Sequence, residues 1–206
     1  MKIINSKKKF LYLISPNKIK PNFYKDLKGV LSLNKTAFFQ LRLKNTSVQN
    51  KILIGKKLKR ICKSFKVKFL INDNPLIAKK IDADGCHLGQ NDLNILEARK
   101  ILGKKIIGIT CHNSLKYAKS AIKNNADYVA FGAFYSTKTK KVKFKASMLI
   151  IKKIKKFSKI PIVAIGGINN KNYKNLLLNK VNFLAISGYI WNNKKFKPIE
   201  AIKKLI

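Results

Sequence analysis

The stretch KFLINDNPLIAKKIDADGCHLGQND, residues 68–92, contains a short apolar run, then a helical pattern, then a second short apolar run. The two apolar runs, at residues 68–71 and 85–88, have the length and composition of buried β-strands. Asn74 before Pro75 is a typical helix start, so we expect a helix over residues 75–81. A strand, a helix and a strand in this order predict a βαβ unit with parallel strands.

The same alternation recurs along the whole chain and predicts eight strand and helix pairs. The expected strands cover residues 10–14, 37–43, 68–71, 85–88, 106–110, 128–132, 162–165 and 183–186. The expected helices cover residues 23–33, 48–65, 75–81, 93–102, 115–124, 147–157, 172–178 and 198–205. This pattern favours an α/β fold that closes as a single (β/α)8 TIM barrel, with a doubly wound sheet as the main alternative.

The chain has the size and composition of one domain. Its 206 residues are 46% hydrophobic, which is sufficient for a sizeable core. No linker rich in Gly, Ser or Pro divides it, so we expect one barrel domain over residues 1–206 with a short basic extension at about residues 1–8.

The formal net charge of +38 raises the alternative of a basic nucleic-acid-binding protein without catalysis. Of the 46 basic residues, only Arg42, Arg60 and Arg99 are arginine, the residue that binds phosphates and base edges best. The lysines are spread along the whole chain, which is more typical of a compositional bias than of a binding site. We therefore expect no specific nucleic-acid partner, although the charge should attract small anionic substrates.

The three cysteines, Cys62, Cys86 and Cys111, match neither a disulfide framework nor a zinc-binding spacing, which predicts a reducing, cytoplasmic setting. The apolar run at residues 10–14 is too short for a signal peptide, and no segment approaches the roughly 20 apolar residues of a membrane span. We expect a soluble protein without a membrane partner. The oligomeric state stays open, with a homo-oligomer among the alternatives.

Polar residues alternate along the last part of the second predicted strand, at the end where barrels place their catalytic groups. The alternation of Gln40, Leu41, Arg42, Leu43 and Lys44 turns the polar side chains one way and the leucines the other. Arg42 and Lys44 could then clamp phosphate oxygens. The alternative is an edge strand with a solvated polar face.

Two carboxylates, Asp73 and Asp92, follow the third and fourth predicted strands in a chain with only eight acidic residues. Two carboxylates combined with substrate phosphates are a common way to hold Mg²⁺. Mn²⁺ would satisfy the same oxygens. Each aspartate could instead be the N-cap of the helix that follows it.

Polar groups also stand at the end of the fifth predicted strand and in the segment after it. Thr110 and Ser114 offer hydroxyls near a helix start, which suits an anion. Cys111 and His112 suggest a nucleophilic dyad, but neighbours on a strand point in opposite directions and no third group orients them. We interpret His87, near the end of the fourth predicted strand, as a hydrogen-bonded residue of the barrel.

The last three strand ends are typical of phosphate binding. Residues 136–140 are hydroxyls and cations that could fold over an anion, with a solvated turn as the alternative. Gly166 and Gly167 follow the seventh strand, and Ser187 and Gly188 follow the eighth. Many barrels bind phosphate in the loops after strands seven and eight. Two phosphate sites at one barrel mouth indicate a transferase that joins two phosphorylated ligands.

Taken in chain order, these motifs resemble the thiamine phosphate synthase family. The motifs are Gln40-Leu41-Arg42-Leu43-Lys44, Ile71-Asn72-Asp73, Asp84-Gly85-Cys86-His87-Leu88-Gly89-Gln90-Asn91-Asp92, Asp127-Tyr128-Val129-Ala130-Phe131-Gly132, Thr137-Lys138-Thr139-Lys140 and Ala164-Ile165-Gly166-Gly167-Ile168. The resemblance implies an enzyme in which thiazole phosphate displaces the diphosphate of hydroxymethylpyrimidine diphosphate. The products would be thiamine phosphate and pyrophosphate.

The resemblance also implies a role for each site residue. Asp73 and Asp92 would bind Mg²⁺. The pyrimidine diphosphate would be bound by Gln40, Leu41, Arg42, Leu43, Lys44, Asn72, Thr110 and Lys140, of which Arg42, Lys44 and Lys140 would be catalytic. The thiazole phosphate would be bound by Thr137, Lys138, Thr139, Gly167, Ile186 and Ser187. Departure of pyrophosphate from an electron-rich aminopyrimidine needs charge neutralisation more than a general base, which these cations and the metal would supply.

Three positions bear on how well the chain fits the family. Thr110 stands where the family usually has Ser, and Ala146 stands where it commonly has Gly. A related branch, the thiazole tautomerase, shares the barrel and a His after strand five, as His112 stands here. That branch typically lacks the aspartate pair, so Asp73 and Asp92 favour the synthase, with the tautomerase as the alternative.

Overall fold

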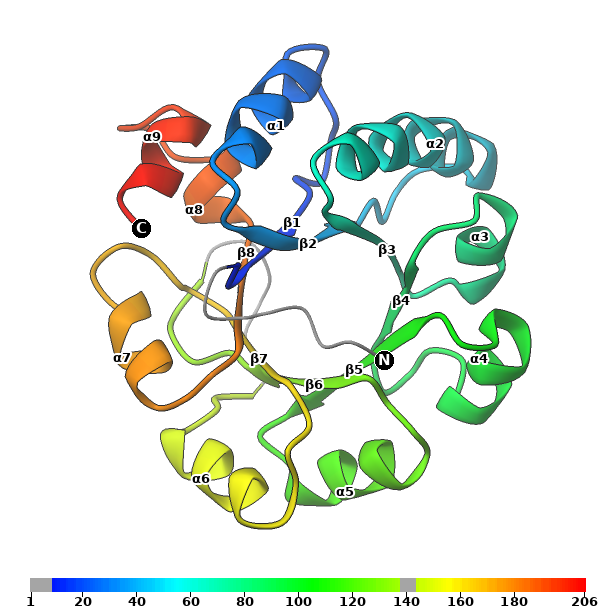
Figure 1. Cartoon of the computed structure of the whole chain (residues 1–206), viewed down its shortest axis with the longest axis vertical. Helices are drawn as coiled ribbons and strands as arrows, with labels where there is room; N and C mark the ends of the chain where they lie inside the picture. Colours follow the sequence, from blue (N-terminus) through cyan, green and yellow to red (C-terminus); the bar gives the residue numbers. More distant parts are fainter. Residues whose placement is uncertain (1–8, 138–143) are drawn as a thin grey trace.

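The computed structural model describes residues 9–137 and 144–206, which form a closed barrel of eight parallel strands (Figure 1). The predicted (β/α)8 TIM barrel is confirmed. Strand β1 pairs with both β2 and β8, so the doubly wound alternative is wrong. The basic extension expected at residues 1–8 lies outside the described residues.

The predicted strands and helices are all present, with small differences at their ends. The strands are β1 Leu11–Ile14, β2 Thr36–Leu41, β3 Lys68–Asn72, β4 Gly85–Leu88, β5 Ile106–His112, β6 Tyr128–Gly132, β7 Ile162–Ile165 and β8 Phe183–Ile186. The helices are α1 Phe23–Ser32, α2 Val48–Ser64, α3 Pro75–Lys80, α4 Ile95–Leu102, α5 Leu115–Lys123, α6 Met148–Phe157, α7 Tyr173–Leu178, α8 Gly188–Trp191 and α9 Pro198–Lys203. The short helix α8 was not predicted.

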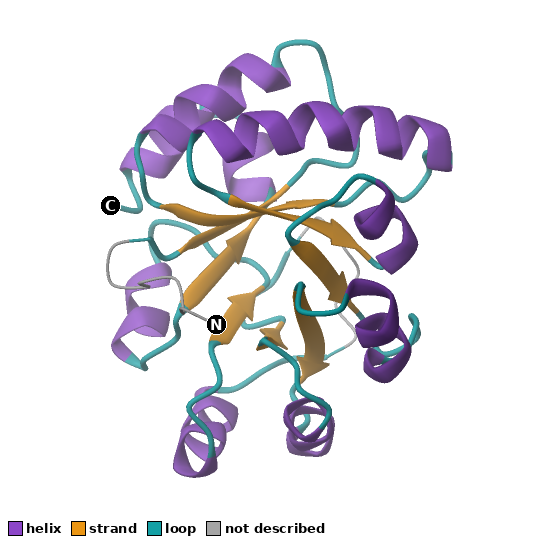
Figure 2. Ribbon diagram, turned by 45° about the vertical axis from the view of Figure 1, so that its right-hand side comes forward, coloured by secondary structure: helices purple, strands orange, loops and turns teal. Residues whose placement is uncertain are grey.

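The helices form an outer layer around the strands (Figure 2). Helix α1 shows why they dock there, because Phe23, Leu27, Val30 and Leu31 recur at helical spacing and are all buried. Burial of each such side chain contributes roughly 1.5–3 kcal/mol relative to exposure. The large core between strands and helices therefore holds the barrel closed.

A second, smaller core fills the inside of the barrel and is unusually aromatic. Its members are Tyr12, Ile14, Ala37, Phe38, Leu70, Ile106, Tyr128, Ala130, Val163, Phe183 and Ala185. The Phe38 ring lies 5.0 Å from that of Phe183 and 5.2 Å from that of Tyr12, measured between centroids. Such rings fill the barrel axis, so the interior is a packed core beneath the mouth.

Gly108 on β5 makes room for one of these rings. A Cβ atom at this position would overlap Cζ of Tyr128, which lies across the inner face of β5. Any larger residue would push Tyr128 out of the barrel centre. The glycine therefore fixes where the Tyr128 hydroxyl can reach.

Three polar residues close the N-terminal rim of the barrel, each standing just before an even-numbered strand. Each accepts a hydrogen bond of 2.8–2.9 Å from the backbone N–H of one residue on the preceding odd strand. Each also donates its own backbone N–H to that residue's carbonyl. The pairs are Asp84 with Phe69, Asp127 with Ile107 and Asn182 with Ile162. Two of the scarce carboxylates thus serve strand register.

Arg99 on α4 reinforces this rim. Its guanidinium donates to the carbonyls of Gly103, Lys105 and Asn125 at 2.6–2.9 Å and to the Asp127 carboxylate at 2.9 Å. The planar fork of arginine suits several acceptors at once. One of the three arginines is therefore structural.

Asp82, in the turn after α3, forms ion pairs with Lys59 and Lys105. Hydrogen bonds from Lys105 and Lys59 lower the pKa of this carboxyl to about 2. A lowered pKa stabilises the fold above the unfolded-state pKa of about 4, and the contribution is lost as pH falls towards the folded value. We expect Asp82→Asn to lower the thermal midpoint at pH 7, by an amount that shrinks below pH 4.

The control for this prediction is the double variant Lys59→Gln, Lys105→Gln. In that background Asp82→Asn should have little effect at either pH, because its partners are gone. Differential scanning calorimetry across the pH range measures both. A loss of the same size at pH 7 and at low pH would contradict the ion-pair origin of the effect.

Candidate active site

The C-terminal ends of the strands form one mouth of the barrel, and the described site residues stand at or just after these strand ends. Gln40, Asn72 and Thr110 come from β2, β3 and β5. Asp73 and Asp92 stand in the loops after β3 and β4. Parallel strands thus bring together residues that are far apart in sequence.

Gln40 lies at the inner face of β2 and is only 2% exposed. Its amide nitrogen donates to Oδ1 of Asn72 on the neighbouring strand. Its Oε1 accepts a hydrogen bond of 2.6 Å from the Tyr12 hydroxyl on β1. These two contacts hold the amide in one orientation beneath the mouth.

Strand β2 ends at Leu41, not at Leu43 as predicted. The ladder stops because the backbone N–H of Arg42 donates to Oγ of Ser15, at 2.9 Å, instead of to a strand. The edge-strand alternative is wrong, since β2 pairs with both β1 and β3. Leu41 and Leu43 are buried in the outer core, so only their backbone can face a ligand at the mouth.

Arg42 and Lys44 lie in the loop that follows β2, close to the aspartates. Burial and the neighbouring Asp92 raise the pKa of Asp73, and the positive charges of Arg42 and Lys44 partly offset this rise, so their fields reach its carboxyl group. The guanidinium of Arg42 makes one long hydrogen bond, 3.4 Å, to Oδ1 of Asn17. Lys44 is exposed. Both side chains can therefore turn towards an anion at the mouth.

Neither Asp73 nor Asp92 caps a helix, so that alternative is wrong. Asn74 caps α3 by accepting from the N–H of Ile77 at 2.9 Å, and Asn94 caps α4 in the same way. Asp92 instead accepts a hydrogen bond of 2.7 Å from the N–H of Gly89 within its own loop. Neither carboxylate is therefore committed to a helix N-terminus.

The two aspartates form a close pair. Partial burial, a side-chain hydrogen bond with Asp92 and the negative charge of Asp92 raise the pKa of Asp73 to about 6. Asp73 is exposed as a whole residue, although its carboxyl group is partly shielded from solvent. Two carboxylates this close are stabilised by a shared proton or by a cation. Their hard oxygens fit a divalent metal ion.

Within residues 9–137 and 144–206, no group of three or more His, Cys, Asp or Glu side chains could hold a metal. Asp73 and Asp92 would therefore supply two oxygen ligands and leave the rest to other donors. Mg²⁺ usually keeps several waters and binds through one or two carboxylates and substrate phosphates. The donor set present fits a hard divalent ion that takes its remaining ligands from outside the protein.

Thr110 lies on β5 and is hydrogen-bonded to His87 on β4, with 2.8 Å between Oγ1 and Nε2. The other ring nitrogen of His87 lies 2.8 Å from the Tyr128 hydroxyl. Burial lowers the pKa of His87 to about 4, so the imidazole is neutral near pH 7. This agrees with the interpretation of His87 as a hydrogen-bonded barrel residue.

The residues expected around the thiazole phosphate come from the ends of β6, β7 and β8. Gly167, at a φ of 64°, packs so closely on the loop after β6 that a Cβ there would overlap the Ser136 carbonyl, next to Thr137. Ser187 donates to the Ser15 carbonyl at 3.2 Å. Ile186 is buried in the outer core, so only its backbone can face the mouth. Lys138, Thr139 and Lys140 lie outside the described residues.

The Cys111 and His112 dyad is not assembled. Burial raises the pKa of Cys111 to about 12, and its thiol points to the Ile109 carbonyl at 3.7 Å. The His112 ring instead packs on Phe144, with 4.3 Å between centroids. Strand β5 continues to His112 through a register shift after Thr110, and its predicted end at Thr110 was therefore too early.

Ala146, at the position where the family commonly has Gly, donates its backbone N–H to the Ala133 carbonyl at 2.9 Å. The Ala133 N–H in turn donates to the Phe144 carbonyl at 2.9 Å. The start of α6 is therefore tied to the segment after β6 by backbone contacts, which an alanine can make.

Sequence reasoning missed two residues of this region, Tyr12 and Tyr128. Their hydroxyls lie 2.8 Å apart at the barrel centre, and one contacts Gln40 while the other contacts His87. Both sit at inward-facing positions of predicted strands. A buried tyrosine hydroxyl needs a partner, and that requirement was the available signal.

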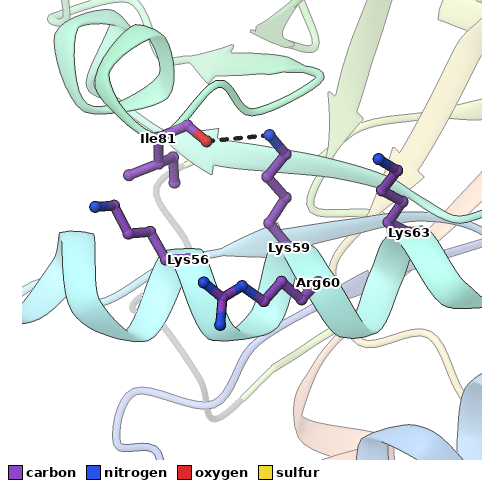
Figure 3. Close-up of a pocket in the computed structure, with 5 residues that line it drawn as sticks. All are labelled: Lys56, Lys59, Arg60, Lys63 and Ile81. Atoms are coloured by element: carbon purple, nitrogen blue, oxygen red, sulfur yellow. Dashed lines mark hydrogen bonds between the residues drawn. The ribbon is translucent and has the colours of Figure 1, made fainter.

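A separate hollow of about 210 Å³ lies in the outer layer of the molecule, between α2 and the end of α3 (Figure 3). Lys56, Lys59, Arg60, Lys63 and Ile81 line it. Lys59 donates to the Ile81 carbonyl at 3.3 Å and also pairs with Asp82. The hollow shares no residue with the barrel mouth and is made from the lysine-rich surface of one helix.

A family model described as thiamine monophosphate synthase matches residues 11–190. The chain belongs to the thiamine monophosphate synthase family. A thiamine-phosphate synthase of Pelagibacter ubique is 67% identical over 199 residues, covering 96% of each chain. One from Erythrobacter litoralis is 37% identical over 202 residues, covering 95% of this chain and 94% of that one.

Solved structures agree with the family. Thiamine phosphate pyrophosphorylase from Pyrococcus furiosus superposes with a TM-score of 0.85 at 30% identity, over 98% of this chain and 95% of that one. An orotidine 5'-phosphate decarboxylase from Pyrococcus horikoshii superposes with a TM-score of 0.65 at 14% identity, over 93% and 95% of the two chains. The second match reflects the shared fold alone.

The function predicted from the sequence is confirmed by these matches: the chain is a transferase of thiamine biosynthesis with thiamine-phosphate synthase activity. The tautomerase and nucleic-acid-binding alternatives find no support in them. Across residues 9–137 and 144–206, no helix combines the length and apolar character needed to cross a bilayer.

Proposed function

We propose that the mouth binds hydroxymethylpyrimidine diphosphate over β2 to β5 and thiazole phosphate over the loops after β6 to β8. The observation that carries this proposal is the Asp73 and Asp92 pair, which lies in the field of Arg42 and Lys44. Acidic and basic groups side by side suit a complex of metal and diphosphate, because each satisfies one part of it.

The pyrimidine would lie above Gln40, Asn72 and Thr110, whose polar groups meet the mouth from three strands. Its diphosphate would be bound by Arg42 and Lys44, with Lys140, which lies outside the described residues, as a third cation. Arg42 binds two phosphate oxygens through its planar fork, while a lysine acts as a point charge. Small phosphorylated substrates also fit the net charge of +38, which raises the local concentration of anions.

The thiazole phosphate would be bound by Thr137, Lys138 and Thr139 together with Gly167, Ser187 and the Ile186 backbone. Gly167 lies against the residue before Thr137, so the loops after β6 and β7 are adjacent. Glycine allows a phosphate to approach the backbone N–H groups closely. The second substrate would then lie beside the first at one mouth.

The reaction breaks the bond between the pyrimidine's methylene carbon and the diphosphate oxygen, and the pyrophosphate leaves with the bonding electrons. The thiazole ring nitrogen then forms the new bond to that carbon. Arg42, Lys44 and Lys140 stabilise the charge that grows on the leaving group. Asp73 and Asp92 would hold Mg²⁺, which when bound neutralises diphosphate oxygens. No group is required to remove a proton before the bond breaks.

The cytoplasm is the proposed location. Cys62, Cys86 and Cys111 are all free and buried, which supports a reducing environment.

The test is formation of thiamine phosphate from the two substrates, followed by oxidation of the product to fluorescent thiochrome. We expect full dependence on a divalent cation: chelator should abolish product formation, and added Mg²⁺ should restore it. Mn²⁺ should also restore activity, since it accepts the same oxygen ligands.

Thermal unfolding in chelator is the control, because the core of this fold does not depend on the metal pair. The midpoint should be nearly unchanged while activity disappears. An undiminished rate in excess chelator would contradict the assignment of Asp73 and Asp92 as metal ligands.

A further inference from the structure

A continuous chain of hydrogen bonds crosses the inside of the barrel and begins and ends at the mouth. From β5 to β3 it connects Thr110, His87, Tyr128, Tyr12, Gln40 and Asn72. The contacts between Thr110, His87, Tyr128 and Tyr12 are each 2.8 Å long, and that between Tyr12 and Gln40 is 2.6 Å. Three proposed substrate contacts are thus connected through residues that lie beneath the substrate.

The direction of this chain follows from counting hydrogens. Oε1 of Gln40 can only accept, so the Tyr12 hydroxyl donates to it. Tyr12 has then used its one hydrogen, so its oxygen accepts from the Tyr128 hydroxyl. Tyr128 has likewise used its hydrogen, so Nδ1 of His87 must carry a proton and donate to the Tyr128 oxygen.

The same argument continues to both ends of the chain. A neutral imidazole carries one ring proton, which here is on Nδ1, so Nε2 of His87 accepts from the Thr110 hydroxyl. The burial of the ring among the aromatic residues of the barrel favours this neutral form. At the other end Gln40 donates to Oδ1 of Asn72. The N–H groups of the Asn72 amide then remain to donate to a ligand.

We propose that Tyr12, Tyr128 and His87 are positioning residues that fix the hydrogen-bond polarity of the pyrimidine site, with Thr110 as acceptor and Asn72 as donor. This inference rests on the proposed placement of the pyrimidine above Thr110 and Asn72. The Thr110 hydrogen is committed to His87, so only its lone pairs face the ligand. Asn72 has committed its carbonyl oxygen to Gln40, so its NH₂ group faces the ligand.

This polarity selects an aminopyrimidine. Such a ring presents an amino group that donates next to a ring nitrogen that accepts, which complements Thr110 and Asn72 in turn. In the corresponding oxopyrimidine, a carbonyl accepts and the neighbouring ring N–H donates. The oxopyrimidine would set acceptor against acceptor and donor against donor. A site with fixed buried polar groups strongly rejects a ligand that leaves them unpaired.

The residues packed around this chain of hydrogen bonds leave the space that its aromatic rings need. Gly108 provides the space in which the Tyr128 ring lies, and the His87 ring stacks on that ring at 5.6 Å between centroids. Gln40 and His87 are among the few buried polar residues in the described part of the protein. Burying polar groups is unfavourable unless each finds a partner. The chain satisfies them by a single pattern of donors.

The protein contains only two histidines, so their imidazole nitrogens can be resolved by ¹H–¹⁵N correlation spectra of histidine-labelled protein. His112→Gln assigns the signals of His87. We expect protonated Nδ1 and unprotonated Nε2 in the parent enzyme. A proton on Nε2 of His87 would overturn the proposed polarity.

Tyr12→Phe tests whether the direction is relayed, because Tyr12 lies two hydrogen bonds away from His87. Without the Tyr12 oxygen, the Tyr128 hydroxyl loses its acceptor and can donate to Nδ1 of His87. The ring proton should then move to Nε2, and the Thr110 hydrogen should turn to the mouth. Tyr128→Phe should likewise place the ring proton on Nε2. The control Tyr24→Phe, on the outer helix α1, should keep it on Nδ1, as in the parent. An unchanged tautomer in Tyr12→Phe would overturn the relay.

Kinetics give an independent readout. Tyr12→Phe should lower kcat/KM for the pyrimidine diphosphate about tenfold, the value of one well-placed hydrogen bond, while KM for thiazole phosphate stays the same. Its preference for the amino over the oxo analogue should fall by a similar factor. A uniform decrease for both substrates would indicate a general structural defect and contradict the positioning role.

The two proposals can fail separately. If the parent tautomer and its relay are as expected but pyrimidine kinetics are insensitive to Thr110→Val, the placement of the pyrimidine is wrong and the polarity of the chain stands. If Thr110→Val does impair use of the pyrimidine diphosphate but His87 carries its proton on Nε2, the placement stands and the polarity is wrong.

Discussion

Replacing Asp73 with Asn is expected to reduce thiamine phosphate formation about a hundredfold to a thousandfold while leaving the barrel folded. The variant removes one of only two carboxylate ligands proposed for the metal ion. Loss of metal-based charge stabilisation is worth several kcal/mol in the transition state, and each 1.4 kcal/mol changes the rate tenfold. The carboxamide is nearly isosteric, so the loop after β3 should keep its shape.

The thermal stability of Asp73→Asn should rise although its activity falls. Asp73 and Asp92 are like charges in close contact, so Asp73→Asn should raise the thermal midpoint in the absence of metal. Higher stability with much lower activity would separate a ligand role from a structural one. Asp26→Asn, on the outer helix α1, is the matched control and should leave the rate unchanged. A rate near that of the parent in Asp73→Asn would contradict the proposed metal site.

Gly108→Ala is expected to destabilise the fold by about 3 kcal/mol or more, because overpacking a full core forces side chains and backbone to move. The new Cβ would occupy the position of Cζ in Tyr128, at the centre of the barrel. Displacing that ring would also break the hydrogen bonds to Tyr12 and His87. Denaturant unfolding followed by circular dichroism measures the loss.

Gly29→Ala makes the same chemical change where the structure has room for it. Gly29 lies inside α1, and a Cβ there would contact only Cδ1 of Ile199 at an ordinary 3.7 Å. Alanine favours a helix over glycine by about 0.5–1 kcal/mol, so this variant should be more stable than the parent. Equal effects of the two substitutions would contradict the tight packing of Tyr128 on Gly108.

The order of strands and helices could be predicted because it depends on local patterns. Apolar runs, helical spacing and start signals such as Asn74 before Pro75 are all contained in short windows. The end of β2 could not, since it depends on Ser15, a residue directly after β1 that accepts a hydrogen bond from the Arg42 N–H. Helix α8, Gly188–Trp191, is too short to show a helical period.

Some residues of the candidate site could also be predicted from the sequence, and others could not. Asp73 and Asp92 could be singled out because acidic residues are scarce, although Asp84 and Asp127 in the same chain stabilise strand pairing at the opposite rim. The pairing of Asp73 with Asp92 depends on the register of neighbouring strands. Tyr12 and Tyr128 were missed because they are 116 positions apart and resemble ordinary core aromatics until the barrel closes.

The reciprocal contacts at the N-terminal rim couple strands in pairs, so the structural units of the barrel are larger than a single strand and its helix. Asp84, Asp127 and Asn182 each join an even strand to the odd strand before it, so β3 with β4, β5 with β6 and β7 with β8 are coupled in pairs. Chain breaks placed between such pairs would keep every one of these contacts within a single fragment. For circular permutation or fragment complementation, new termini therefore belong after an even-numbered strand and its helix.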